Sequence, residues 1–376
     1  MRPHWPAIFV HMKKILSLSL IVTTAFLIWS CSGTGSGNTM IFKDSVRIID
    51  EFPFEYALSA PDTVSTGVIG LSGFDIQDSL LIVSTRTKTD SWKILRISDM
   101  TLLGEFLNTG NGPDEFVSFV PSVSYADRIV ENGCLNYLLT DINRRILHKF
   151  NVTRSLYIQQ ADISSMQNDI PPACFEYIFI DDSTCFYKQP APDNTGFIRM
   201  LARNGESFEP EGLKEINSAH VNPGQWYGPV YTNLWYSRNR NIIVEISSAL
   251  NNINLYTPDA TWRKSLCIGR PDNLDDIVNG PREREPITFC QARLYDDFFA
   301  AMYLGETALS YETGRTELPH IYCFGYDGSP LADIRIDKLA EDFGFAGRRL
   351  YVLDPNTESF WRYDLPEDFP ESLIID

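Results

Sequence analysis

A pair of short apolar strands recurs six times along the chain. The first strand of each pair lies at 79–83, 134–139, 184–187, 241–246, 298–302 and 349–353. The second strand follows after a polar turn, at 92–96, 145–150, 196–200, 252–256, 321–324 and 360–363. Successive pairs start about 50 residues apart, and a period of this length is typical of repeat architectures. A β-sandwich would not repeat six times at this interval.

A repeat of about 50 residues, built from short strands and turns, has the size of one four-stranded propeller blade. Helical periodicity is nearly absent from the chain. We therefore predict an all-β fold, a six-bladed β-propeller of four-stranded blades that occupies residues 42–376 as one domain. We expect the N-terminal strand at 46–49 to close the ring by completing the last blade, with Leu373–Ile375 as the alternative.

The N-terminal segment has the flanks and the length of a secretion signal. Lys13–Lys14 precede an uncharged, mainly apolar stretch at 15–29, and Cys31 follows shortly after it. As a helix this stretch would span only about 22 Å, whereas a bilayer core is roughly 30 Å thick. The stretch is too short for a permanent span, so we predict a signal peptide at 1–30, with Met12 as the true start.

A loop motif adds a likeness to a known family. Residues 110–116 read Gly-Asn-Gly-Pro-Asp-Glu-Phe. Together with the six strand pairs and the cysteine after the signal, this motif resembles the TolB-like six-bladed β-propeller lipoproteins that are common in Bacteroidota. The resemblance covers essentially the whole chain after the signal. It implies the propeller fold and an envelope location, but it implies no defined biochemical role.

The resemblance also predicts that Cys31 is lipidated and begins a flexible Gly/Ser tether at 31–41. The alternative is an ordinary cleaved signal in which Cys31 is incidental. Several acyl chains on one cysteine would hold the protein stably on the lipid bilayer, whereas a single chain binds only marginally. Because no acidic residue directly follows Cys31, we expect an outer-membrane protein that faces the periplasm, with exposure on the cell surface as the alternative.

The charge of the chain argues against two kinds of partner, nucleic acid and anionic lipid. The formal net charge is −17, and residues 1–30 contain three basic residues and no acidic residue, which leaves about −20 on the remainder. Such an acidic body should not bind nucleic acid, and it should not bind anionic lipid through a basic surface.

The cysteines that follow the tether give no redox or zinc motif. They are Cys134, Cys174, Cys185, Cys267, Cys290 and Cys323. None has Cys-x-x-Cys spacing, and most lie in apolar runs. An oxidising compartment would permit disulfides, but we favour buried free thiols because a chain of this length does not need covalent crosslinks.

The 110–116 loop supplies the first candidate binding residues. Gly110 and Gly112 permit positive φ angles, and Asn111, Asp114 and Glu115 are candidates to line a polar pocket. The alternative is a purely structural turn between blades. Asp and Asn also recur in the turns between second and third strands, which emerge on the same face of a propeller as the connections between blades. If their oxygens converge, the expected metal is Ca²⁺; otherwise they are ordinary turn formers.

An aromatic loop supplies the second set of candidates. Trp226 and Tyr227 lie in the long connection before the fourth strand pair, within Gly-Gln-Trp-Tyr-Gly-Pro. Exposed Trp and Tyr side chains could stack on a sugar or hold a peptide, because each has an apolar body and a polar tip. The alternative is that both pack between blades.

Signals of catalysis are sparse. The histidines after the signal are His148, His220 and His320, and none lies in His-Glu-x-x-His spacing. The chain contains no Gly-x-Ser-x-Gly elbow, P-loop or dinucleotide fingerprint. We therefore favour a non-catalytic binding module for a protein, peptide or glycan, with no cofactor. The alternative is a metal-dependent hydrolase or lyase, of calcium type, that acts on a sugar or lactone in the propeller channel.

Overall fold

The structure, a computed structural model, describes residues 38–112, 114–117 and 120–375. The chain divides into two units, Met1–Gly37 and Asn38–Asp376. The predicted signal peptide, Cys31 and most of the predicted tether lie outside the described residues, so those predictions stay predictions.

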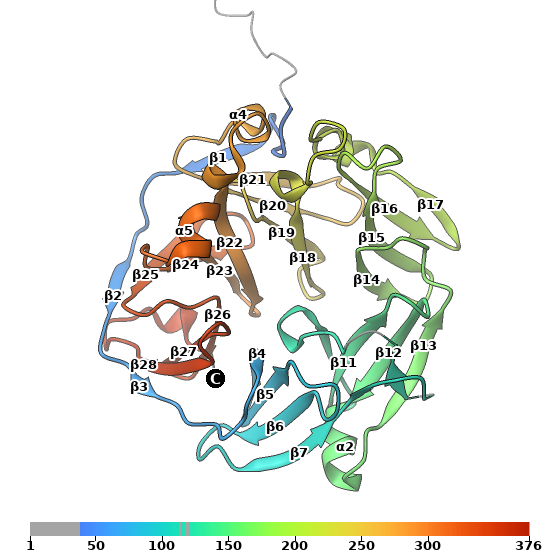
Figure 1. Ribbon diagram of the computed structural model, residues 1–376, viewed down its shortest axis with the longest axis vertical. Coiled ribbons are helices and arrows are strands. Elements are labelled where there is room, and N and C mark those ends of the chain that lie inside the picture. Colours follow the sequence, from blue (N-terminus) through green and yellow to red (C-terminus); the bar gives the residue numbers. More distant parts are fainter. Residues whose placement is uncertain (1–37, 113, 118–119, 376) are drawn as a thin grey trace, which may run out of the picture. The chain divides into compact units, whose positions relative to one another are not determined.

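The second unit is a ring of six β-sheets (Figure 1). Blade one contains β4 (Leu71–Gln77), β5 (Leu80–Thr85), β6 (Trp92–Arg96) and β7 (Leu102–Phe106). Blade two contains β10 (Asp127–Glu131), β11 (Cys134–Asp141), β12 (Ile146–Asn151) and β13 (Ile163–Asn168). Blade three contains β14 (Glu176–Asp181), β15 (Thr184–Pro190), β16 (Phe197–Arg203) and β17 (Glu206–Phe208).

The remaining blades follow the same antiparallel order. Blade four contains β18 (Thr232–Ser237), β19 (Ile242–Ser247), β20 (Asn252–Tyr256) and β21 (Arg263–Ile268). Blade five contains β22 (Pro286–Leu294), β23 (Phe298–Thr307), β24 (His320–Gly325) and β25 (Pro330–Ile336). Blade six contains β26 (Asp342–Ala346), β27 (Arg349–Asp354), β28 (Ser359–Asp364) and β3 (Asp62–Thr63).

The predicted fold class is confirmed. Each predicted strand pair coincides with the second and third strands of one blade, such as β5 and β6 or β27 and β28. These strands are recognisable because both of their faces are covered by neighbouring blades. Leu81, Ile82 and Val83 in β5 are successive residues, and all are almost fully buried.

The N-terminal residues form a belt along the outer edges of three blades, and we call residues 38–64 the belt. Strand β1 (Val46–Ile49) joins β21 in parallel, and β2 (Glu55–Leu58) joins β25 in parallel. Strand β3 then pairs with β28 and supplies the fourth strand of blade six. Figure 1 shows this blue segment passing from blade four to blade six.

The belt corrects the predicted closure. The N-terminal segment does close the ring, but through Asp62–Thr63, because 46–49 pairs with blade four instead. At the other end of the chain, Ile375 forms only an isolated bridge with Gly347.

The belt also moves the start of the propeller body. Met40 and Phe42 are 1% and 0% exposed. The Met40 carbonyl accepts hydrogen bonds from the side-chain amides of Asn252 (3.1 Å) and Asn254 (2.8 Å). The packed body therefore begins at Asn38 and not at residue 42. Within the described residues, every core cluster lies between positions 40 and 375, so this body carries its own core.

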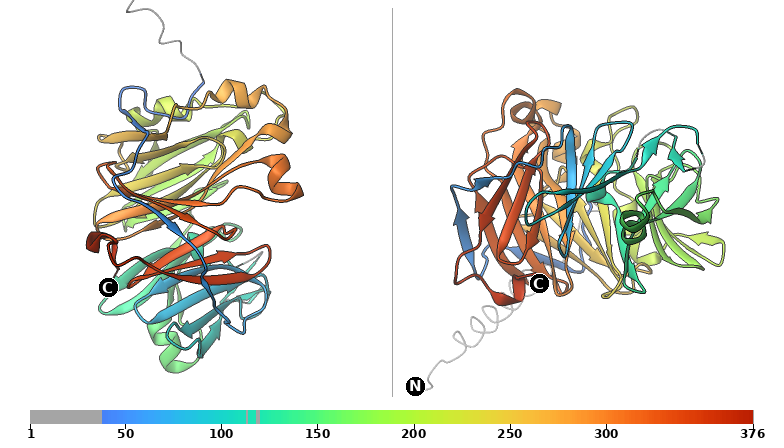
Figure 2. Two further views of the ribbon diagram at one scale, coloured as in Figure 1. Left: turned by 90° about the vertical axis from the view of Figure 1, so that its left-hand side faces the viewer. Right: turned by 90° about the horizontal axis from the view of Figure 1, so that it is seen from below.

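Short helical segments lie in the connections between strands. They are α2 (Val152–Ile158), α3 (Lys214–Asn217), α4 (Leu274–Val278), α5 (Ala308–Thr313), η1 (Val123–Tyr125), η2 (Glu211–Leu213), η3 (Gly228–Val230), η4 (Arg282–Arg284) and η5 (Glu371–Leu373). Because strands alternate in direction, connections between blades emerge on the same face as the turns between second and third strands. We call this the connection face, and Figure 2 shows α4 and α5 protruding from one side of the ring. None of the helices described is long and apolar enough to cross a membrane.

The six cysteines of the described body are free thiols. Four of them are buried, and Cys134 and Cys290 are half-buried. Burial raises the pKa of the Cys174 and Cys267 thiols to about 12, so both stay protonated and unreactive at neutral pH.

Candidate functional site

The 110–116 motif forms a turn that is held together by its own groups. The Glu115 carboxylate folds back and accepts a hydrogen bond from the Gly112 amide at 2.7 Å. The Arg144 guanidinium donates to the backbone carbonyls of Glu115 (2.6 Å) and Gly112 (2.9 Å). These bonds fix the connection between blades one and two.

The glycines of this motif provide space and do not use the positive φ angles that glycine permits. The φ angles of Gly110 and Gly112 lie outside the left-handed region. A Cβ atom on Gly110 would lie 2.1 Å from Oε2 of Glu115, so only glycine lets the carboxylate fold back.

The motif does not converge on a cavity. Asn111 and Asp114 are exposed, and Glu115 is half-buried within the turn. Phe116 is buried, and its ring lies 5.3 Å from the ring of His148. These contacts support the structural reading of the motif, whereas ligand binding by Asn111, Asp114 and Glu115 stays a prediction.

The Asp- and Asn-rich turns use their oxygens locally. Oδ1 of Asp193 accepts hydrogen bonds from the Thr195 hydroxyl (2.7 Å) and amide (3.1 Å), and these bonds lower the pKa of Asp193. Oδ1 of Asp354 likewise accepts from the Asn356 amide at 3.0 Å. Among the described residues, no group of three or more His, Cys, Asp or Glu side chains could hold a metal ion.

A cavity with a volume of about 1090 Å³ occupies the central channel of the ring. Its walls come from the innermost strands β4, β10, β14, β18 and β22, together with the segment at 120–126. Nine of the lining residues are aromatic. They are Tyr125, Phe175, Tyr177, Phe179, Tyr231, Trp235, Tyr236, Tyr295 and Tyr326.

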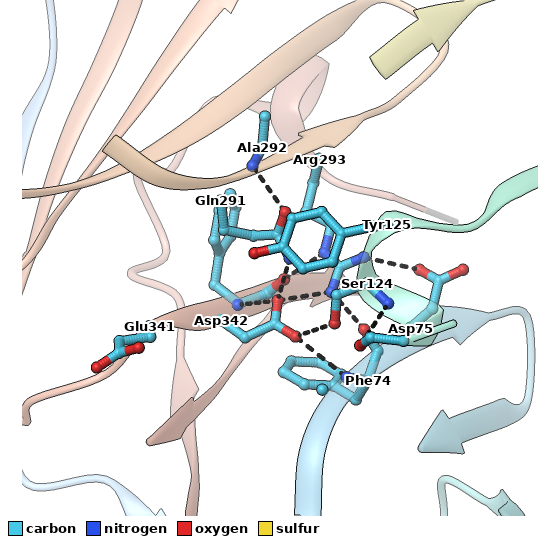
Figure 3. Close-up of polar contacts among 12 residues, drawn as sticks. Phe74, Asp75, Ser124, Tyr125, Gln291, Ala292, Arg293, Glu341 and Asp342 are labelled. Carbon is cyan, nitrogen blue, oxygen red and sulfur yellow. Dashed lines mark hydrogen bonds and ion pairs between the residues drawn. The ribbon is translucent and has the colours of Figure 1, made fainter. Parts of the chain in front are cut away.

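The segment that contains η1 reaches across the channel. The Ser124 hydroxyl donates to Oδ2 of Asp342 in blade six at 2.6 Å, and the Ser124 carbonyl accepts from the indole of Trp235 in blade four at 3.5 Å. The Tyr125 hydroxyl donates to the Cys290 carbonyl in blade five at 3.4 Å. Figure 3 shows Ser124 and Tyr125 beside Asp342. The connection from blade one therefore contacts the opposite side of the ring.

A buried charge cluster lies at the wall of the channel (Figure 3). Arg293 on β22 pairs with Asp342 at 2.6 Å and lies 3.7 Å from Asp75 on β4. Burial acts to lower the pKa of Arg293, but the two carboxylates outweigh it and raise that pKa. Arg128 also pairs with Asp75, at 3.5 Å, and the Tyr137 hydroxyl donates to Asp75 at 2.6 Å. This cluster joins blades one, two, five and six.

Two further ion pairs involve residues that line the channel. Arg238 pairs with Asp127, and its guanidinium lies 5.4 Å from the ring centre of Tyr236. Burial raises the pKa of Asp127, although Arg238 opposes this shift. Glu176 pairs with Lys188, and burial raises the pKa of Glu176 against the effect of that lysine. The carboxylates of these pairs are thus neutralised by cations.

The predicted aromatic pair, Trp226 and Tyr227, lies next to a residue that lines this channel. Trp226 is 61% exposed and stacks on Tyr227, with ring centres 4.8 Å apart. The ring of Tyr227 lies 6.2 Å from that of Phe175, which lines the channel. Tyr227 therefore contacts one channel-lining residue, but neither Trp226 nor Tyr227 is itself among the residues that line the channel.

The sequence reasoning did not place Asn233 or Tyr125 in a binding site. Asn233 and Trp235 lie two residues apart on β18, so they share one side of that strand, and both line the channel. The alternation in Thr-Asn-Leu-Trp-Tyr-Ser is a signal that could have placed them together. Tyr125 carries no such signal, because it lies in a connection.

Comparisons with known proteins show likeness of structure only. No family model matches this chain. No curated protein matches it either. A member of the DUF4221 family from Bacteroides vulgatus is 13% identical, with a TM-score of 0.47 over 79% of this chain and 91% of that chain. A putative exported protein from Bacteroides fragilis is 8% identical, with a TM-score of 0.40 over 84% of this chain and 99% of that chain.

The calcium-binding protein regucalcin from Agrobacterium tumefaciens is 9% identical, with a TM-score of 0.42 over 83% of this chain and 95% of that chain. These likenesses do not bear on the ligand or the activity of this chain, because the identities are so low.

Proposed function

We propose that this chain is a lipid-anchored protein of the bacterial envelope and acts as a non-catalytic binding module, with the central channel as its binding site. The observation that carries the proposal is the channel itself, a cavity of about 1090 Å³ whose lining includes nine aromatic side chains. Ligand sites are typically concave, rich in aromatic groups and fitted with a few polar side chains that orient the ligand.

The charges of the channel favour binding over hydrolysis. A pair of catalytic carboxylates needs one group that can donate a proton and one that can accept it. Here Asp75, Asp127 and Asp342 are each paired with a guanidinium group. The described histidines serve elsewhere, since His320 bonds to Asp333 at 2.8 Å and His148 packs on Phe116.

Removal of one aromatic side chain from the channel should abolish ligand capture. We expect an immobilised body, residues 38–376, to retain an envelope component, and the Trp235→Ala variant to lose it, because Trp235 lines the channel. The matched control is Trp262→Ala, since Trp262 is 36% exposed in the turn between β20 and β21 and is not among the channel-lining residues. The measurement is retention on the three columns after equal washing. Equal retention by all three proteins, or no retention by any, would contradict a channel site.

The anchor is tested separately. We expect Cys31→Ala to release the protein from the membrane pellet into the soluble envelope fraction, because an acidic body is not attracted to anionic lipid. The measurement is fractionation after a carbonate wash. The control is Cys134→Ala, which removes a half-buried thiol from the body. A Cys31→Ala protein that stays in the membrane fraction would rule out the proposed lipid anchor.

A further inference from the structure

The charged groups of the channel leave little net charge for a ligand to meet. The charged lining residues are Asp75, Asp127, Arg128, Glu131, Glu176, Arg238, Arg293 and Asp296. Within the described residues, all of these except Asp296 take part in an ion pair. Oδ1 of Asp296 accepts a hydrogen bond from the Asn239 side-chain amide at 3.2 Å. An anionic ligand would therefore find no unpaired cation among the described lining residues and would lose its hydration.

The channel also presents flat aromatic faces. Tyr125 is 54% exposed, and its ring centre lies 5.8 Å from that of Trp235 at an angle of 34°. The Trp235 indole N–H donates a hydrogen bond to the Ser124 carbonyl at 3.5 Å, and this bond holds the indole ring in place. Such rings offer apolar faces of fixed orientation to a ligand in the channel.

A neutral polar group stands beside these rings. Asn233 is half-buried, lines the channel and lies on the same side of β18 as Trp235. Among the interactions found between described residues, none engages the Asn233 side-chain amide. An amide offers both a donor and an acceptor, as a hydroxyl group does, so the two match each other.

We propose that the channel binds a neutral glycan, with one sugar ring against Trp235 and Tyr125 and its hydroxyl groups on Asn233. This inference rests on the proposed function. Neutral sugars combine apolar C–H faces with a rim of hydroxyl groups, which matches aromatic faces beside an amide. A purely apolar ligand would leave the polar wall without hydrogen-bond partners, and an anionic ligand would find no unpaired cation among the described lining residues.

The size of the channel indicates more than one sugar unit. Its volume of about 1090 Å³ lies at the upper end of the roughly 300–1,000 Å³ of small-molecule sites. Phe175, which also lines the channel, lies next to Tyr227, and Tyr227 stacks on Trp226, with ring centres 6.2 Å and 4.8 Å apart. A short oligosaccharide would therefore extend from the channel over Tyr227 and Trp226.

The test is calorimetric titration of the body, residues 38–376, with neutral hexasaccharides of glucose, mannose, xylose and N-acetylglucosamine. Oligogalacturonate and a mixed peptide library serve as competing classes. We expect at least one neutral hexasaccharide to bind, with an affinity that changes by less than about twofold between about 50 mM and about 500 mM sodium chloride. Trp235→Ala should weaken this binding about tenfold or more, and Asn233→Ala about fivefold. Trp262→Ala should leave it unchanged.

The outcomes separate this inference from the proposed function. Binding of oligogalacturonate or peptide alone, when weakened by Trp235→Ala, would overturn the neutral glycan and keep the channel as the binding site. Binding that none of the channel variants changes would overturn both. Failure of every neutral hexasaccharide to bind would overturn the glycan inference. Each variant is used only if its melting temperature lies within about 5 °C of that of the parent body.

Discussion

Replacing Arg293 with methionine should lower the free energy of unfolding by about 3–5 kcal/mol, because it leaves buried carboxylates without their cation. The Arg293 guanidinium pairs with Asp342, lies 3.7 Å from Asp75 and donates to the Phe343 carbonyl at 2.8 Å. These partners belong to blades one and six, whereas Arg293 belongs to blade five. The variant therefore weakens the ring at the junction next to the closing blade, and urea unfolding of the body measures the loss.

The matched control is Arg349→Met. Arg349 and Asp364 form an exposed pair at 3.6 Å, with half of the arginine side chain and most of the aspartate in solvent. Exposed pairs contribute only about 0–1 kcal/mol, so this variant should unfold close to the parent. If Arg293→Met lost no more stability than Arg349→Met, the Arg293 cluster would not hold the blades together.

Removing the belt should abolish the folded ring. A body that begins at residue 65 lacks β1, β2 and β3, and with them the buried side chains of Met40, Phe42, Ile49 and Leu58. Each such side chain contributes roughly 1.5–3 kcal/mol, and their combined loss is comparable with the roughly 5–15 kcal/mol that stabilises a whole domain. We expect no cooperative thermal transition for residues 65–376, as followed by circular dichroism.

The control for the belt is the body at 38–376, which should melt as the full chain does. A synthetic peptide of residues 38–64 should restore the transition when it is added to the truncated body, because the belt joins the ring through parallel and antiparallel strand pairing. A truncated body that melts cooperatively at the parent temperature would show that the belt is not needed for closure.

The fold could be predicted because its strongest signal is local. The second and third strands of each blade are short runs of successive apolar residues, such as Leu81–Val83, and six such pairs fix the blade number. The closing strand gave no comparable signal. Asp62 and Thr63 are both exposed polar residues, and their partners Arg362 and Trp361 lie about 300 positions away.

The site was predictable only in part, for the same physical reason. Trp226 and Tyr227 are adjacent in the chain, so their stacking could be inferred from sequence. The channel cluster has no local pattern, since Ser124 and Asp342 are 218 positions apart and Arg293 and Asp342 are 49 apart. Convergence of such residues comes from the ring and not from any segment.

The claim that the channel is the binding site is tested most directly by hydrogen–deuterium exchange. The body, residues 38–376, is compared with and without the component that it retains. We predict slower exchange on the channel-lining strands β10, β14 and β18 and in the segment at 120–126, and unchanged exchange on the outer strands β7, β13 and β17. Protection confined to the outer strands, with no change along the channel, would contradict a channel site.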